Sequence, residues 1–558
     1  MRNGVEFPIS LCAFRSGVPN RKMQKKHHKS AIVSWVIGLI AFSFAMSHAG
    51  GLTLLAIPLG LIAIGMGVSG AYSIHRSAPA FRGTGLAIGG ALFGVLAAVV
   101  SIGFFAGLFV QQMDPHRWQR ARSAKLEKAV AAAIPVSSEP VSAFTSNLPI
   151  IVLHTGGQHI SKENTKVIQA EFYDTEDGRA SLKAKPAYEG LIDIHLRGHS
   201  SLELPKHSFT IHTLDAKTNQ TKVALLGLPK EEDWVLYAPF EDKTMIRDVL
   251  AFQLANKMGR YAPRTRYVEL FMSRSAQGVS IRDYAGVYVL MEKIKRGENR
   301  VNIAKLKPED RTEPEITGGY IVKRDHDERN ETRFRTEYGG PYFFVYPKGD
   351  QVTSQQKSYL RNYFNSFESA LYGSDFKDPK TGYAAYLDVD AFIDAHWLVE
   401  MSKNVDGFRY STFLTKDRGG KLKSGPPWDW NRSFGNANYY NGDKVNGWYW
   451  AKLRPHEISW YRRLREDPDF EERCVARWFE LRRNVFDPKK INATIDQLAA
   501  QLEEAQQRNF KRWPILGQQV TCNSYVGDSY EDEVRWLKEW VTGRIAWIDK
   551  QMYASAKE

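Results

Sequence analysis

The most constraining feature of the sequence is a stretch without charged side chains between Lys29 and Arg76. A helix that crosses a bilayer needs about 20 apolar residues, so a stretch of this length accommodates two crossings. A further uncharged run extends from Gly83 to Met113, and it is rich in the small residues of closely packed transmembrane helices. We therefore expect two or three transmembrane helices within residues 31–113, with the lipid bilayer as a partner.

Basic residues on both sides of these runs bear on the orientation of the chain. The basic leader, residues 1–30, carries five basic residues between positions 21 and 29, which favour a cytoplasmic N-terminus. Three crossings would then place the following domain outside the cytoplasm. Five basic residues between positions 117 and 128 favour the opposite side. We expect the protein to be held in the membrane by a multi-pass anchor. The basic residues leave the side of the domain that follows the anchor undecided, and the count of three spans favours the extracytoplasmic side.

The composition of the 558 residues indicates folded domains, because 43% are apolar and 12% are aromatic. Three cysteines are too few for a disulfide framework, and they form no CxxC pair of the kind found in structural zinc sites. The formal charge of +14 comes from basic residues dispersed along the chain, without a groove-reading motif. We therefore expect no nucleic-acid partner.

The remainder of the chain divides into segments that differ in composition and in hydrophobic periodicity. Residues 114–147 have the composition of a linker, since a basic, alanine-rich segment is followed by serines and prolines. Short alternating segments then give way to helical periodicity after Trp460. We expect one α+β domain over residues 148–555, with a helical C-terminal part. The expected strands include 148–154, 167–173, 191–197 and 208–214, and a helix is expected over 244–258.

Residues 388–436 contain the most informative pattern. Asp388 is suited to cap a helix that ends near Asn404. Alternating residues up to Lys416, the turn sequence Asp-Arg-Gly-Gly and a second alternating segment then predict a β-hairpin.

The register of this hairpin places two aspartates together. If the turn is centred on residues 417–420, cross-strand partners have residue numbers that sum to about 835–837. Asp406 then lies opposite residues 429–431, so Asp406 and Asp429 are neighbours at the open end, about 5 Å apart.

Two neighbouring carboxylates suit several kinds of chemistry. In phosphoryl transfer, one aspartate accepts the proton of the attacking hydroxyl and another holds Mg²⁺ against the phosphates. Two carboxylates about 5 Å apart also suit a retaining glycosidase. A purely structural role is open as well, in which Asp406 caps a turn and Asp429 pairs with Arg432.

A second motif is the turn Arg197-Gly198-His199-Ser200-Ser201, followed by Lys206. Backbone N–H groups in such a turn can cradle phosphates, and a nearby lysine can neutralise them. An ordinary hairpin is the alternative interpretation.

Two further charged residues lie at the ends of expected elements. Arg247 is near the start of the helix expected over 244–258, where it could face an anionic ligand or pair with Asp242. Glu292 ends an alternating segment that begins at Gly286. The alternative to a functional role for Glu292 is a charged side chain that is merely exposed to solvent.

These motifs, in this order, resemble the spore coat protein H (CotH) kinase family over roughly residues 148–550. The resemblance implies an atypical protein-kinase-like fold that uses ATP and Mg²⁺ or Mn²⁺ to phosphorylate Ser/Thr residues of protein substrates. It implies that Asp406 is the catalytic carboxylate and Asp429 a metal ligand. The elements that carry the resemblance are Arg197–Ser201, Pro205-Lys206, Leu225–Leu228, Asp233-Trp234, Asp242–Arg247, Gly286–Tyr288, Glu292–Lys295, Gly318–Tyr320, Asp406, Pro427–Asp429 and Phe434-Gly435.

The resemblance also extends to candidate nucleotide-binding residues and to the N-terminus. Ser200, Lys206, Arg247 and Glu292 lie in matching motifs and are the candidates for contacts with ATP. Residues 82–90 resemble part of a short bacterial multi-span membrane module, which carries no known chemistry.

One position departs from the protein-kinase pattern. A kinase catalytic loop has an asparagine five residues after its aspartate, where it binds a second metal ion. The corresponding residue here is Ser411, and a hydroxyl is a poorer metal ligand than an amide oxygen.

The leading hypothesis is therefore a membrane-anchored atypical kinase that transfers the γ-phosphoryl group of ATP to protein hydroxyls. The alternative is a pseudokinase scaffold at the cell envelope that binds protein or polysaccharide without turnover. A carbohydrate enzyme with two carboxylates is the third possibility.

Overall fold

The computed structural model describes residues 141–555, apart from residues 142, 176, 276–277, 327–330, 455–456 and 458–459. These residues belong to the second of two compact units, residues 119–558. None of the helices in this described part has the length and apolar composition that a membrane crossing requires. The expected multi-pass anchor is corrected accordingly: no described helix supports it, and the spans placed at 31–113 lie outside the described residues.

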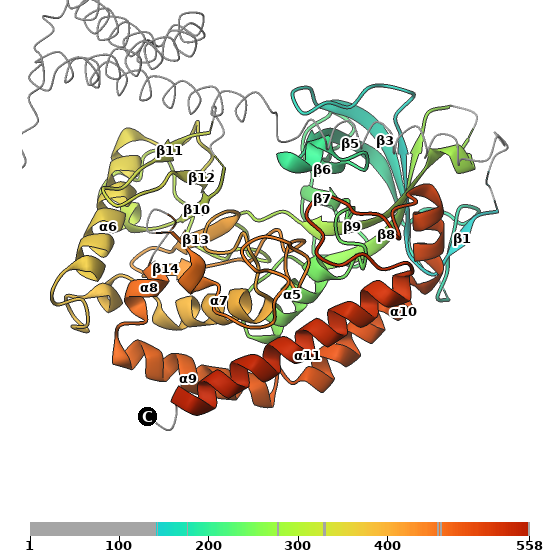
Figure 1. Cartoon of the computed structure of the whole chain (residues 1–558). Helices are drawn as coiled ribbons and strands as arrows, with labels where there is room; N and C mark the ends of the chain where they lie inside the picture. The colour runs from blue at the N-terminus through green and yellow to red at the C-terminus, as the bar shows by residue number, and fades with distance from the viewer. Residues whose placement is uncertain are drawn as a thin grey trace, which may run out of the picture. The chain divides into compact units, whose positions relative to one another are not determined.

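Seven strands in the first half of the described part close into a barrel (Figure 1). Apolar residues alternate along them, for example Ile151 and Leu153 or Ile192 and Ile194, and these side chains fill the barrel interior. Neighbouring strands are antiparallel except β2 and β8, whose parallel pairing closes the barrel. Around the barrel the strands are β2 (Ile150–His154), β3 (Lys166–Tyr173), β5 (Tyr188–Arg197), β6 (Ser208–Thr213), β7 (Asp233–Tyr237), β9 (Tyr284–Glu292) and β8 (Thr265–Ser273).

A second sheet of five strands follows the barrel in the chain. Its order is β11-β12-β10-β13-β14, with antiparallel pairing throughout. The strands β13 and β14 are the predicted hairpin, so the sheet carries the segment between the two aspartates. The bounds are β10 (Tyr320–Arg324), β11 (Arg333–Phe334), β12 (Tyr342–Tyr346), β13 (Thr412–Lys416) and β14 (Leu422–Ser424); two short strands, β1 (Thr145–Ser146) and β4 (Ala180–Ser181), pair separately.

Seven α-helices complete the described part, and their starts follow from the sequence. Asp388, Asp467 and Asp487 cap helices with their side chains, and the last two are followed by proline at the first helical position. Figure 1 shows α10 and α11 as a long pair, which contacts both β9 and α7. The helices are α5 (Arg247–Lys257), α6 (Ser354–Tyr372), α7 (Val389–Ser402), α8 (Trp460–Leu464), α9 (Pro468–Arg483), α10 (Pro488–Arg512) and α11 (Tyr530–Ser555).

The chain is thus α+β, but the expected fold class is wrong in its details. The described residues do not show a protein-kinase-like fold preceded by transmembrane helices: the strands within residues 150–292 form a closed barrel of seven strands. The physical reason is that alternation predicts where strands lie but not which strands pair. Closure depends on pairing between residues 150–154 and 269–273, more than a hundred positions apart.

A buried ion pair ties the C-terminal helix to α7. Arg544 on α11 lies 3.0 Å from Glu400 on α7, and both side chains are fully buried. Glu400 also accepts hydrogen bonds from the backbone N–H groups of Tyr449 and Trp450, at 3.0 and 2.7 Å. One carboxylate therefore holds together α7, α11 and the segment that contains Tyr449 and Trp450.

We predict that Arg544→Met lowers the free energy of unfolding by about 3–5 kcal/mol, because it leaves the Glu400 carboxylate buried without its ion-pair partner. Urea unfolding followed by circular dichroism measures this. The matched control on the same helix is Lys538→Met, whose partner Asp496 is exposed; we expect a change within about 1 kcal/mol. Equal effects of the two substitutions would contradict the prediction.

Candidate active site

The segment that carries Asp406 begins where α7 ends. Asp388 caps α7 by accepting a hydrogen bond from the N–H of Ala391, at 3.0 Å. Lys403 ends the helix in a left-handed conformation, with φ at +47°. The loop then folds around Asp406, whose carbonyl accepts hydrogen bonds from the N–H groups of Arg409 and Tyr410. The predicted helix and hairpin are both confirmed.

The register of the hairpin differs slightly from the expected one. Leu414 pairs with Ser424 and Lys416 pairs with Leu422, so partner numbers sum to 838. The strands also stop short of the two aspartates, since β13 begins at Thr412 and β14 ends at Ser424. Asp406 and Asp429 therefore lie on loops beyond the ladder, yet both line one cavity of about 360 Å³.

Basic side chains surround the Asp406 carboxylate. Arg409 lies 3.4 Å from it and Arg432 lies 3.9 Å from it. The hydroxyl of Tyr439 donates a hydrogen bond to the carboxylate, at 3.3 Å. Arg409 is itself fixed by Glu457, at 2.9 Å. The orientation of Asp406 is thus set by three neighbours.

Asp429 occupies a contrasting environment. Its backbone is left-handed, with φ at +63°, which is uncommon for a residue with a side chain and is frequent at functional sites. Burial and the nearby Asp406 raise the pKa of Asp429 to about 7. Burial and the charge of Asp429 likewise raise the pKa of Asp248 to about 8. The carboxylates around Asp429 are thus crowded enough to disfavour their own ionised forms.

The cavity also presents cations. Arg197 lies with its guanidinium 4.9 Å from the centroid of the Trp428 ring. Burial lowers the pKa of Arg197 to about 10, and the charges of Asp429 and Asp325 oppose this shift. The charged residues that line the cavity are Lys162, Arg197, Lys293, Lys323 and Arg432 with Glu241, Asp248, Asp325, Asp406 and Asp429.

The structure brings some of the predicted site residues to this cavity and leaves others outside. Ser200 and Ser411 line it together with the two aspartates. Lys206 does not: its ammonium is buried and donates to the carbonyl of Val287, at 2.6 Å. Glu292 is also absent from the lining, because its buried carboxylate pairs with arginines.

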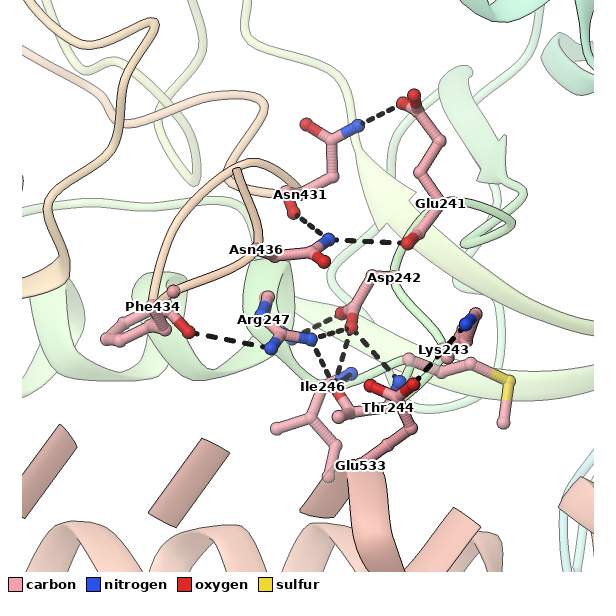
Figure 2. Close-up of polar contacts among 12 residues, drawn as sticks. Glu241, Asp242, Lys243, Thr244, Ile246, Arg247, Asn431, Phe434, Asn436 and Glu533 are labelled. Atoms are coloured by element: carbon pink, nitrogen blue, oxygen red, sulfur yellow. Dashed lines mark hydrogen bonds and ion pairs between the residues drawn. The ribbon is translucent and has the colours of Figure 1, made fainter. Parts of the chain in front are cut away.

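Arg247, the remaining predicted residue, serves a structural purpose (Figure 2). Its side chain is 1% exposed and pairs with Asp242, at 2.5 Å. Its Nε and Nη2 atoms donate to the carbonyls of Ser433 and Phe434, at 3.1 and 3.5 Å. Arg247 therefore positions the segment that follows Asp429 and does not face the cavity.

Neighbouring contacts fix the same segment. Asp248, the next residue of α5, accepts a hydrogen bond from the N–H of Trp430, at 2.8 Å. Glu241 accepts one from the side chain of Asn431, at 2.8 Å, and its carbonyl accepts one from Asn436 (Figure 2). The start of α5 and the residues before it thus hold both ends of the segment that follows Asp429.

The cavity also brings together several residues that were not predicted as site residues from the sequence. Arg197 stood in the recognised turn, and Lys293 directly follows Glu292, but neither was selected. Arg409 and Tyr439 follow Asp406 without a spacing that marks them. Alternation along β9 could have indicated Lys293, because adjacent residues of a strand face opposite sides.

We predict that Gly435→Ala destabilises the protein by about 2 kcal/mol more than Gly419→Ala. Both glycines have positive φ, +84° and +64°, so both substitutions carry a similar backbone cost. Only at Gly435 would the new Cβ clash, lying 2.6 Å from Trp540 on α11, whereas nothing lies within 4 Å at Gly419. Thermal unfolding of both variants measures the difference, and equal shifts would refute the predicted clash.

The chain was compared with known proteins and protein families. No curated protein matches the chain. A family model described as CotH kinase protein matches residues 194–548, which is more than half of the chain and includes Asp406, Asp429 and Arg197. The chain therefore belongs to the CotH kinase protein family, and this membership indicates a kinase-like function.

Proposed function

We propose that the protein is an ATP-dependent phosphotransferase that moves the γ-phosphoryl group of ATP to Ser/Thr hydroxyls of a protein substrate. The observation that carries the proposal is that Asp406 and Asp429 line one cavity together with basic side chains. Phosphoryl transfer needs a carboxylate near the attacking hydroxyl and positive charge around the phosphates. The family membership supports the same class of reaction.

The residues of the cavity fit a divalent cation. Asp429 forms no ion pair among the described residues, and burial and the charge of Asp406 raise its pKa, so a cation would stabilise its ionised form. Mg²⁺ and Mn²⁺ prefer oxygen ligands, which Asp429 and the Ser411 hydroxyl supply. When bound, such a cation neutralises charge on the phosphates of ATP.

In this proposal Asp406 acts on the acceptor. Its carboxylate orients the Ser/Thr hydroxyl and accepts the proton as the oxygen bonds to the γ-phosphorus and ADP leaves. Arg409 and Tyr439 keep the carboxylate in place, at 3.4 and 3.3 Å. A base held in this way loses little freedom on reaching the reactive geometry.

In this proposal, the residues that contact the phosphates of ATP differ from those expected from the sequence. Arg197, Lys293 and Lys323 line the cavity, whereas Lys206 and Arg247 do not. At Gly198, which precedes Ser200, an added Cβ would lie 2.0 Å from the Ser201 hydroxyl, so the turn is tight. Basic side chains suit the phosphates of a nucleotide, and the carboxylates that line the same cavity suit a bound cation.

We predict that Asp406→Asn lowers the rate of phosphoryl transfer by about 10²–10⁴-fold, because it removes the proton acceptor. Asp429→Asn should abolish transfer by removing the metal ligand. The assay incubates the full chain with labelled ATP, Mg²⁺ or Mn²⁺ and a serine-rich acceptor protein. Asp378→Asn, in an exposed turn, is the matched control and should retain activity.

The outcomes of this assay separate the hypotheses. Label that persists in both variants would contradict the assigned roles. If no label appears with either metal although ATP raises the melting temperature, a pseudokinase scaffold is the better account. If neither label nor a thermal shift appears, the kinase function fails.

A second prediction compares two basic residues. Arg197→Met should raise the dissociation constant of ATP by about 10–100-fold, because charge-assisted hydrogen bonds contribute about 1.5–3 kcal/mol. Lys206→Met should leave it within about threefold, since Lys206 is buried outside the cavity. Fluorescent-nucleotide titration measures both constants, and a larger effect at Lys206 would reverse the assignment.

A further inference from the structure

The carboxylates of the active-site cavity divide into two groups. Three have a basic partner close by: Glu241 with Arg432 at 3.3 Å, Asp325 with Lys323 at 3.3 Å, and Asp406 with Arg409 at 3.4 Å. Asp248 and Asp429 form no ion pair within the described residues. The cavity therefore holds two carboxylates without a direct ion-pair partner, although the charges of Arg197 and Arg432 act on Asp429 from a greater distance.

Asp248 is unusual among these residues because it is almost completely buried. It lies in the first turn of α5 and is 4% exposed. One oxygen, Oδ1, accepts the hydrogen bond from the N–H of Trp430, at 2.8 Å. The other oxygen, Oδ2, is buried and has no hydrogen bond of normal geometry in the described part of the chain. The Tyr237 side chain, which lines the same cavity, is the polar neighbour that stabilises the Asp248 carboxylate. A buried carboxylate oxygen without a partner is costly unless a ligand satisfies it.

The contact with Trp430 also fixes where Asp248 lies. Trp430 directly follows Asp429, so the hydrogen bond holds the Asp248 carboxylate beside the residue proposed to bind the metal. The side chains of both aspartates line the same cavity. Because Oδ1 is occupied, Oδ2 is the oxygen left to bind a ligand.

We propose that Asp248 is a second carboxylate ligand of the divalent cation that Asp429 binds; this inference rests on the metal role of Asp429 in the proposed function. Two carboxylates balance the charge of a divalent cation, which Asp429 with the neutral Ser411 hydroxyl does not. Small divalent cations such as Mg²⁺ are commonly held by one or two carboxylates. Asp325 is less suited, since Lys323 already engages it.

The test measures Mn²⁺ binding to the full chain without nucleotide, by electron paramagnetic resonance of the free ion. Asp248→Asn keeps an oxygen that can accept from Trp430 but removes the charge at Oδ2. We expect Asp248→Asn and Asp429→Asn each to weaken Mn²⁺ binding at least about tenfold. Asp325→Asn, the same substitution in the same cavity, should stay within about threefold.

Each result bears on the proposal. Wild-type affinity in Asp248→Asn, a larger loss in Asp325→Asn, or no Mn²⁺ binding to the wild type would overturn it. A cooperative melting transition shows that a variant is folded. If Asp248→Asn does not fold, Asp248→Glu replaces it in the test. The longer side chain moves the carboxylate oxygen away from the metal, so Mn²⁺ binding should weaken at least about threefold, and unchanged affinity would overturn the proposal.

The phosphoryl-transfer assay keeps the two proposals apart. If the wild type binds Mn²⁺ through both aspartates but transfers no phosphate, the metal site stands and the phosphotransferase function fails. If transfer proceeds and Asp248→Asn binds Mn²⁺ like the wild type, the function stands and the role of Asp248 fails.

Discussion

The buried ion pair between Arg247 and Asp242 is the interaction on which the candidate site depends. It joins the start of α5 to the chain after Asp429, because the same guanidinium holds the carbonyls of Ser433 and Phe434. The Asp429 segment has left-handed backbone at both Asp429 and Phe434, a conformation that needs support from its surroundings. Arg247 supplies part of that support from a position where no solvent competes for its hydrogen bonds.

The charges of the cavity explain how one site can serve both a cation and an anion. Asp406 is surrounded by arginines and a tyrosine hydroxyl, whereas Asp429 and Asp248 line the same cavity and neither forms an ion pair within the described residues. The basic side chains Arg197 and Lys293 line the same space. Metal-bound ATP carries both signs of charge, so the distribution suits it better than either ion alone. Another acidic cluster, Glu231–Asp233, differs because Lys295 pairs with all three carboxylates.

Local features of the sequence predicted local structure well. Asp388, the alternation before Lys416 and the Asp-Arg-Gly-Gly turn led to a helix and a hairpin, and the structure contains both. These elements depend on neighbours in the chain, so their signals are visible in the sequence. Closure of the barrel depends on the pairing of β2 with β8, which no local pattern reveals.

The site was predictable to the extent that it follows from the hairpin. Asp406 and Asp429 share a cavity, as the spacing suggested, whereas Lys206, Arg247 and Glu292 point into buried contacts. A charged residue in a motif does not disclose whether it faces a ligand or a buried partner. For Arg247 the partner was present five residues earlier, as Asp242, and both alternatives were physically reasonable.

The most direct test of the account is a crystal structure with Mn²⁺ and a non-hydrolysable ATP analogue, with Mn²⁺ located by anomalous diffraction. The account predicts an anomalous peak about 2.0–2.6 Å from a carboxylate oxygen of Asp429, with the phosphates beside Arg197. A peak at Glu231–Asp233 with nucleotide bound outside the cavity would contradict it, because the two aspartates would then have no part in binding metal or ATP.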